Sequence, residues 1–475
     1  MNGMIGFLRR QSWTDRILLA VALGCLIATA IQYPLSTTFP IGGDAAAHIA
    51  TVQHLQTRPM YTLNRIMHSW YPVSYLLFST LTFAPKISWT DVYPWWMALG
   101  QITTGLSVGV LARRMYGNKA GIIAMAIWGL TPITMTSFFE DATMGQLWSL
   151  PWIVLFFERL SAKSLPGMAV CALLALLSHP ITGCILLATL MFTTINLWLG
   201  HHKFSKEEEI IRKIFTWITI AGAVTALYLL ATRFEVLLLQ SRESSIYIPE
   251  LFHGFFYPWL LLSILGWTMF IILSAKHNAL TAISLGSFFF LSFLLAANNY
   301  LGIGFWTNRV NAYLLICIVL GAAIGFSYIV ETTKAPRISV LAAIFVLLGA
   351  TISVWNTNAN IYRRTESKTL YIRIHPEELE AIAWIRTTTP LHSIVFTSAI
   401  TRHYEWIPVL SDREWKTITL NEIQSPKYEE LENEKYITFF TRKERAPEYI
   451  RNNTVKYSLV YENKGSEIFQ IIPTP

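Results

Sequence analysis

The sequence predicts an all-α polytopic membrane protein with about eleven transmembrane helices and a small C-terminal α/β domain. Of its 475 residues, 53% are hydrophobic and 14% are charged, whereas a soluble domain usually carries about 25% charged residues. Apolar windows of about 17 to 25 residues recur along the first three quarters of the chain, a length that crosses about 30 Å of hydrocarbon as a helix. Beyond about residue 360 the composition becomes that of a soluble domain.

Basic residues orient the first predicted helix, residues 17–33. Arg9, Arg10 and Arg16 precede it, so the positive-inside rule places the N-terminus in the cytoplasm. No small-residue cleavage site follows the apolar run, which indicates a retained helix rather than a cleaved signal peptide. The next segment, residues 34–91, therefore forms a loop on the outer side of the membrane.

Residues 70–84, "WYPVSYLLFSTLTFA", are predicted to lie in the outer interface. If this short segment crossed, "ARRMYGNK" at 112–119 would lie outside, against the positive-inside rule. We therefore expect interfacial helices in the outer loop. The later predicted spans alternate without contradiction, near residues 92–112, 120–138, 147–160, 165–178, 181–199, 213–231, 257–274, 279–297, 310–330 and 338–355.

An odd number of crossings places the C-terminus outside. The chain accordingly divides into a transmembrane domain, 1–358, and an extracytoplasmic α/β domain, 359–475, which at about 110 residues can form a modest core. In the second domain, "EELEAIAWIRTTTP" predicts an amphipathic helix and "SIVFTSAI" a strand. The segment "YSLVYENKGSEIFQII" predicts a hairpin that turns at residues 463–465.

The net charge of +8 does not indicate a nucleic-acid partner. The basic residues lie in short loops beside apolar spans, where they set orientation. All four cysteines fall in apolar segments, so neither a disulfide framework nor a thiol metal site is predicted. The lack of an organelle-targeting signal favours a prokaryotic plasma membrane.

The topology above was set by the basic residues alone. In it, the polar residues that stand out within or beside the apolar segments all face the outer side. Ionisable groups at membrane depth cost several kcal/mol and usually line a cavity or pair with one another. We therefore expect one functional site at the outer face. Its candidate residues are Asp44 and His48 in the first outer loop, Glu140 and Asp141 in the second, His179 in "LLSHPITGC", Arg233 and Glu235 where a span emerges, and Arg309 and Asn311 at the outer end of another span.

Most of these candidates also have a structural interpretation. Asp44, after two glycines, can cap a helix, and His48, one turn later, can be a satisfied structural histidine. The pair Glu140–Asp141 can simply solvate a short loop. The pair His179–Pro180 can break a helix without binding anything. Arg309 can extend to the lipid headgroups or hold an anion with two hydrogen bonds.

Together these features resemble the GT-C superfamily of integral-membrane glycosyltransferases, which includes oligosaccharyltransferases, protein mannosyltransferases and aminoarabinose transferases. The segment "GGDAAAHIATVQHL" is similar to the Asp-x-x-x-His form of the first-loop motif in prokaryotic members. "ARRMYGNKAGIIAMAIWGLTP" is similar to their connection between the second and third spans, and "LLSHPITG" to a recurrent histidine-proline break. The resemblance covers about residues 15–330 and, in 384–415, part of the outer domain. It depends on the order and shared sidedness of the motifs.

The resemblance implies an inverting transfer of a sugar from a polyprenyl phosphate or pyrophosphate carrier to a glycan, lipid or protein acceptor on the outer face. Asp44 would be the base, and Arg309 would hold the departing phosphate. Asp44 and Asp141 could together hold Mg²⁺ or Mn²⁺. The implied catalytic residues are Asp44, Asp141, Glu140 and His48, and the implied substrate-binding residues are Arg309, His179, Arg233 and Asn311.

The sequence also departs from the family's subgroups. It has neither the paired Asp-x-Asp motifs nor the WWD-type signature of oligosaccharyltransferases, so asparagine is a poor candidate acceptor and a metal-independent reaction stays open. "WYPVSYLL" has one proline where other subgroups have a proline-rich first loop. Two other functions stay open: a transporter or flippase whose charges line a substrate path, and a non-catalytic GT-C-like scaffold that binds lipid.

Overall fold

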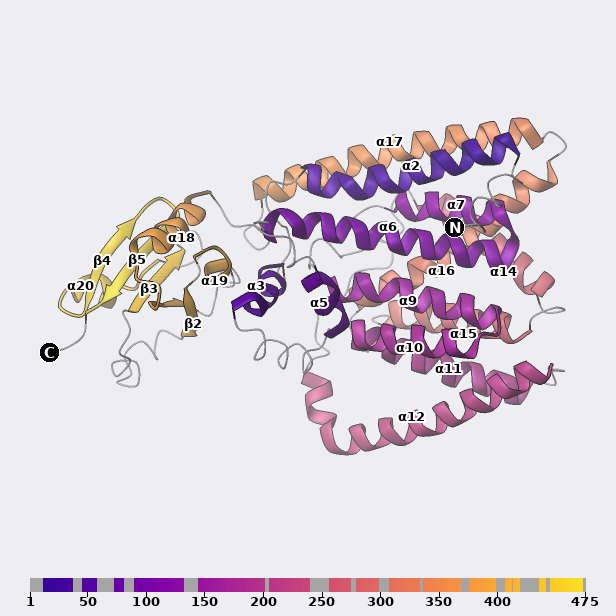
Figure 1. Cartoon of the computed structure of the whole chain (residues 1–475), viewed down its shortest axis with the longest axis horizontal. Helices are drawn as coiled ribbons and strands as arrows, with labels where there is room; N and C mark the ends of the chain where they lie inside the picture. Colours follow the sequence, from indigo (N-terminus) through magenta and orange to yellow (C-terminus); the bar gives the residue numbers. More distant parts are fainter. Residues whose placement is uncertain are drawn as a thin grey trace.

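The chain forms a helical body with a small α/β domain at one end (Figure 1). The computed structural model describes residues 12–36, 45–57, 72–80, 89–131, 144–200, 205–239, 256–274, 279–298, 307–333, 336–368, 376–398, 406–411, 413–418, 435–440 and 445–472. The helical body consists of α2 (Trp13–Ser36), α6 (Trp89–Tyr116), α7 (Asn118–Gly129), α9 (Met144–Ser161), α10 (Leu165–Ser178), α11 (Pro180–Leu199), α12 (Lys206–Leu239), α14 (Phe256–Ser274), α15 (Ala279–Ala296), α16 (Thr307–Thr332) and α17 (Pro336–Lys368). Two further helices, α3 (Ala45–Thr57) and α5 (Pro72–Ser79), lie at the end nearest the α/β domain (Figure 1).

The helices of the body follow the predicted spans in order. Within the described part of the chain, five of them are long and apolar enough to cross a membrane, which is typical of a membrane-embedded protein. These five are Trp13–Ser36, Pro180–Leu199, Ala279–Ala296, Val310–Thr332 and Arg337–Ala359. The predicted domain boundary at 358/359 lies inside α17, which continues to Lys368.

Helix α7 is shorter than the span predicted at 120–138. It ends at Gly129, where the N–H of Leu130 still bonds the carbonyl of Ala126 and the N–H of Thr131 bonds that of Trp128. Pro132 disfavours a helical conformation at the residue before it, which explains the stop. Residues 132–143 lie outside the described part. The interfacial prediction at 70–84 falls on α5, whose eight residues extend only about 12 Å, too little to cross.

Helices α14 and α16 pack backbone against backbone. A Cβ atom added at Gly266 would lie 1.8 Å from the carbonyl oxygen of Gly321, and one at Gly325 would lie 2.2 Å from that of Leu262. Glycines four residues apart on α16 therefore allow the close approach that small-xxx-small motifs give in membranes. The contact holds α16, whose first turn carries Arg309, in the middle of the helical body.

The C-terminal domain is built on one five-stranded sheet with the order β2-β1-β3-β5-β4. Its strands are β1 (Ile394–Ser398), β2 (Glu414–Ile418), β3 (Lys435–Phe440), β4 (Tyr457–Glu462) and β5 (Ser466–Ile471), and its helices are α18 (Pro376–Thr388), α19 (Trp406–Ser411) and α20 (Glu448–Asn452). The predicted helix, the first strand and the hairpin are all present. Strands β2 and β3 are additional; both pair with β1 in parallel.

The two faces of this sheet have different neighbours. Ile394 and Phe396 of β1 belong to a local core shared with α20. Val395, between them, belongs instead to the large core that includes α18, α19 and the helical body. Because side chains alternate along a strand, the described residues of β1 pack toward the helical body on one face of the sheet and toward the local core on the other.

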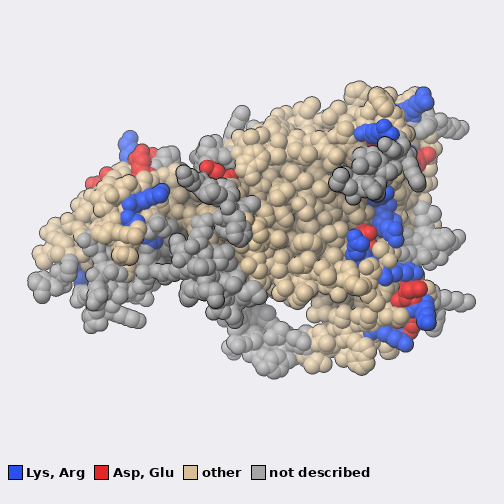
Figure 2. Space-filling view, in the orientation of Figure 1, with Lys and Arg blue, Asp and Glu red and all other residues tan. Residues whose placement is uncertain are grey.

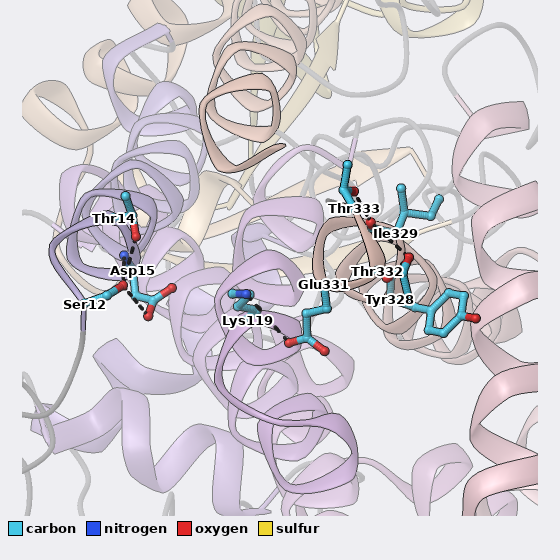
Figure 3. Close-up of polar contacts among 9 residues, drawn as sticks. All are labelled: Ser12, Thr14, Asp15, Lys119, Tyr328, Ile329, Glu331, Thr332 and Thr333. Carbon is cyan, nitrogen blue, oxygen red and sulfur yellow. Dashed lines mark hydrogen bonds and ion pairs between the residues drawn. The ribbon is translucent and has the colours of Figure 1, made fainter. Parts of the chain in front are cut away.

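Charged side chains gather at the end of the helical body away from the C-terminal domain, and the middle is uncharged on the face shown in Figure 2. This end is called the charged end below, and the end beside the C-terminal domain the polar end. At the charged end Lys119 lies 4.0 Å from Glu331 (Figure 3), Lys163 lies 3.5 Å from Glu208, and Arg212 lies 2.6 Å from Glu209. The hydrogen bond from Arg212 lowers the pKa of the Glu209 carboxyl.

Two helix starts at the charged end, those of α2 and α12, are capped by side chains. Asp15 accepts a hydrogen bond from the Ser12 hydroxyl at 2.7 Å and donates its backbone N–H to the same oxygen at 3.2 Å (Figure 3). Ser205 and Glu208 form a reciprocal capping box at the start of α12. Short-range side-chain contacts therefore satisfy these two helix starts.

Candidate functional site

Several candidate residues lie outside the described part of the chain. Asp44 is the residue before α3, and Glu140 and Asp141 come shortly before α9. Arg233 and Arg309 lie within α12 and α16, and their side chains are outside the described part. Their roles stay predictions. The described residues show instead how the elements that carry them are held together.

His48 is buried on α3, with only 3% of its surface exposed. Its Nδ1 atom shares a hydrogen bond of 2.9 Å with the Tyr75 hydroxyl on α5. Its ring lies nearly parallel to that of Tyr93 on α6, with 6.4 Å between the ring centres. His48 therefore ties α3 to both α5 and α6, one helical turn after Asp44.

Helix α5 connects this site to the turn between α10 and α11. The Ser74 hydroxyl donates a hydrogen bond of 3.2 Å to the carbonyl oxygen of Ser178, the last residue of α10. Ser74 and Tyr75 are adjacent, so one short helix contacts the region of both predicted histidines. Ser74 is fully buried and Tyr75 is nearly so.

His179 is the one residue between α10 and α11, and its backbone is extended, with φ −160° and ψ 121°. The chain folds back here, since a Cβ added at Gly183 would lie 3.2 Å from the Cα atom of Leu176. In a continuous helix, residues seven apart would be about 10 Å apart. The histidine-proline pair therefore turns the chain between two helices and does not interrupt a single span.

Thr182, in the first turn of α11, is the centre of a buried hydroxyl cluster. Its oxygen lies 2.6 Å from Ser149 Oγ on α9, 2.5 Å from the Tyr313 hydroxyl on α16 and 3.3 Å from Nδ1 of His179. Thr182, Ser149 and Tyr313 are fully buried, and His179 is 1% exposed. The cluster joins three helices and the turn.

The direction of each hydrogen bond in the cluster follows from counting hydrogens. The Ser149 hydroxyl donates to the carbonyl oxygen of Gln146 at 2.6 Å, and a carbonyl can only accept. Ser149 must then accept from Thr182, so the remaining bonds of Thr182 must come from donors. Tyr313 therefore donates its O–H to Thr182, and Nδ1 of His179 carries a hydrogen and donates as well.

Asn311 lies two residues before Tyr313 and is 5% exposed. Its side-chain oxygen is buried and has no hydrogen-bond partner among the described residues. Arg309 precedes Tyr313 by four residues, one turn of α16. The first turns of α16 thus bring Arg309, Asn311 and the hydroxyl cluster into one region of the polar end.

Hydrogen bonds and chain neighbours together connect α3, α5, α9, α11 and α16. From the start of α3, next to Asp44, they run through His48, Tyr75 and Ser74 to the turn at His179. From there they continue through Thr182 to α9, which follows Asp141, and to α16, which carries Arg309. The elements next to Asp44, Asp141 and Arg309 therefore meet at the polar end.

Sequence reasoning missed Tyr75, Ser149, Thr182 and Tyr313. Serine, threonine and tyrosine are common in membrane helices, and only the packing shows that these hydroxyls meet. Within the described residues, no group of three or more His, Cys, Asp or Glu side chains could hold a metal ion. The predicted metal pair, Asp44 and Asp141, lies outside them.

No protein-family model matches the chain, and no curated protein matches its sequence. Solved structures do match. The archaeal oligosaccharyltransferase AglB from Archaeoglobus fulgidus, in complex with an inhibitory peptide and a dolichol-phosphate, has a TM-score of 0.56 at 13% identity, over 85% of this chain and 65% of that chain. ArnT from Cupriavidus metallidurans, bound to undecaprenyl phosphate, has a TM-score of 0.56 at 10% identity, over 96% of this chain and 98% of that chain.

A further structure, of the A. fulgidus oligosaccharyltransferase in complex with Zn and sulfate, has a TM-score of 0.52 at 14% identity, over 84% of this chain and 62% of that chain. This chain thus spans somewhat less than two thirds of the two archaeal chains and nearly all of ArnT. These proteins are GT-C glycosyltransferases. The predicted resemblance is confirmed, and at these identities it shows the fold: the chain has the fold of the GT-C glycosyltransferases.

Proposed function

We propose that this protein is an inverting glycosyltransferase. It would move a sugar from a polyprenyl phosphate or pyrophosphate carrier to a glycan, lipid or protein acceptor. The observation that carries the proposal is the set of buried hydrogen bonds that, together with chain neighbours, joins the elements next to Asp44, Asp141 and Arg309. The fold supports the reaction class, and the dolichol-phosphate and undecaprenyl phosphate in the neighbours' structures support the donor class.

In the proposed reaction Asp44 accepts the proton of the acceptor nucleophile as it attacks the anomeric carbon. The bond to the carrier phosphate breaks on the opposite side, so the anomeric configuration inverts. Arg309 stabilises the charge that grows on the leaving phosphate. The buried amide oxygen of Asn311 would accept a hydrogen bond from a sugar hydroxyl, which relieves a cost of about 1–3 kcal/mol for an unpaired group.

The remaining candidates take supporting roles in this proposal. His48 orients the first turn of α3 beside Asp44, and His179 sets the turn next to the substrate. Asp141, with Glu140, positions the acceptor or shares Mg²⁺ or Mn²⁺ with Asp44. The Zn in one archaeal structure supports divalent-ion use within this fold. Arg233 would contact the carrier where α12 leaves the membrane.

We also propose the orientation. The charged end has Arg113, Arg114, Lys119 and Lys163 and would face the cytoplasm by the positive-inside rule. The polar end and the C-terminal domain would then lie on the outer face of a plasma membrane, after about eleven crossings. Val455 is exposed in the C-terminal domain. A cysteine introduced there by Val455→Cys should therefore be labelled by a membrane-impermeant thiol reagent in intact cells.

Asp44→Asn tests the catalytic role. It keeps the size and the capping ability of the side chain and removes the base, so we expect transfer to fall by about 10²–10⁴-fold while binding of an undecaprenyl phosphate probe is retained. Asp91→Asn, on the exposed N-terminal turn of α6, is the matched control. If the Asp44→Asn protein transferred the sugar at the wild-type rate, Asp44 would not be the catalytic base. Carrier movement across vesicles without any transfer by the wild-type protein would indicate a flippase.

A further inference from the structure

Helix α3 contacts the C-terminal domain directly, through α19 (Figure 1). The Gln53 side-chain amide donates a hydrogen bond of 3.3 Å to the backbone carbonyl of Val409. Val52 on α3 and Ile407 on α19 are fully buried in the same apolar core. The same α3 also packs on α5 and α6 through His48. One short helix therefore joins the outer domain to the candidate site.

The position of α3 depends on these contacts. It has 13 residues, and isolated helices shorter than about 12–15 residues are marginally stable in water. The position of such a helix is therefore determined by the elements against which its buried face packs. Those elements are α5 and α6 on the membrane side and α19 on the domain side.

Arg413 attaches α19 to the rest of the domain. Arg413 is 8% exposed, and its guanidinium donates to Ser411 O at 3.1 Å, Arg386 O at 2.8 Å, Thr389 O at 2.7 Å and Thr389 Oγ1 at 3.1 Å. Arg386 and Thr389 lie at the C-terminal end of α18, where a cation also complements the helix dipole. Helix α19 has six residues, so this clamp makes it move with α18.

We propose that α19 is a joint through which the C-terminal domain sets the position of α3, and with it the segment that begins at Asp44. Arg413 and Gln53 are then positioning residues on the two sides of the joint. An acceptor that binds the domain would act on the proposed base through this contact. This inference rests on the proposed function, but its mechanical part can be measured separately.

Amide hydrogen exchange of the full-length protein in lipid nanodiscs measures the mechanical part. We expect Arg413→Met and Gln53→Ala each to raise the exchange of α3 amides by about threefold or more, because each variant loses hydrogen bonds that hold α19 or α3 in place. Gln53→Ala leaves the domain itself intact, so it answers the question even if Arg413→Met unfolds the domain. Arg451→Met is the matched control, because Arg451 pairs with Glu467 on the far side of the sheet from α19.

Turnover of the same variants measures the functional part. We expect Arg413→Met and Gln53→Ala to lower kcat by about three- to tenfold with little change in the KM for the lipid donor, and Arg451→Met to change neither. Unchanged α3 exchange in both joint variants would overturn the joint itself. Increased exchange with unchanged kcat would overturn its link to catalysis. Absence of transfer by the wild-type protein would overturn the proposed function and leave the exchange result standing.

Discussion

The two ends of the helical body hold polar groups in different ways. At the charged end, Lys119 and Glu331 face each other at 4.0 Å with side chains 24% and 41% exposed. At the polar end, Thr182, Ser149 and Tyr313 are fully buried, and their hydroxyls bond one another. Water can replace a surface partner, whereas a buried donor that loses its partner stays unpaired. The charged end therefore uses exposed pairs that water can replace, whereas the polar end uses buried hydrogen bonds that it cannot.

The largest effect is expected from removing the central hydroxyl of the polar end. Thr182→Val removes the hydroxyl oxygen to which both Tyr313 and His179 bond in the cluster, which should cost about 2–4 kcal/mol of stability. Thr189→Val, in the same helix, is the matched control. Thr189 is equally buried, but among the described residues its hydroxyl bonds only the Ile185 carbonyl of its own helix, at 2.7 Å. Thermal unfolding in detergent would compare them, and equal losses would contradict the cluster's role.

A smaller effect is expected where the polar end holds α3. Tyr75→Phe keeps the ring and removes the hydrogen bond to His48, so we expect a loss of about 1 kcal/mol and a lower kcat for transfer. Thr80→Ala removes an exposed hydroxyl that bonds Leu77 O at the end of the same helix and should change neither quantity. Chemical unfolding and turnover assays on both variants measure this. If Tyr75→Phe and Thr80→Ala behaved alike, the hydrogen bond between Tyr75 and His48 would not hold α3 in place.

The smallest effect is expected at the charged end. Lys119→Met and Glu331→Gln should each change stability by about 0.5 kcal/mol or less, because exposed ion pairs contribute little. A double-mutant cycle measured at low and high salt gives the coupling energy between the two side chains. A coupling energy well above 1 kcal/mol would contradict the expectation that the ion pairs of the charged end contribute less to stability than the buried hydrogen bonds of the polar end.

Much of the fold could be predicted from short stretches of sequence. The helix at 165–178 follows from its apolar run, and the turn at 463–465 follows from Asn463, whose side-chain oxygen accepts the N–H groups of Gly465 and Ser466. Strands β2 and β3 were not predictable in this way. Each is short and is stabilised by parallel pairing with β1 across long connections, a signal that no local pattern contains.

The candidate site was predictable only in part. Charged and histidine residues stand out against an apolar background, so Asp44, Asp141, His179 and Arg309 could be selected. Tyr75 could not, because nothing near it in the sequence marks it as a partner of His48, 27 positions earlier. Asp44 and Asp141 themselves lie outside the described residues, so their roles are still predictions from the sequence.

Hydropathy and charge act segment by segment, and for that reason the chain alone specifies its membrane character, the order of its helices and the side on which the basic residues lie. Thr182 and Tyr313 are separated by 131 positions, and Gln53 and Val409 by 356. Whether such atoms meet depends on how helices rotate and pack, which in α14 and α16 is set by glycines at the contact. The meeting of α3, α5, α9, α11 and α16 at one end is thus a property of the packed molecule.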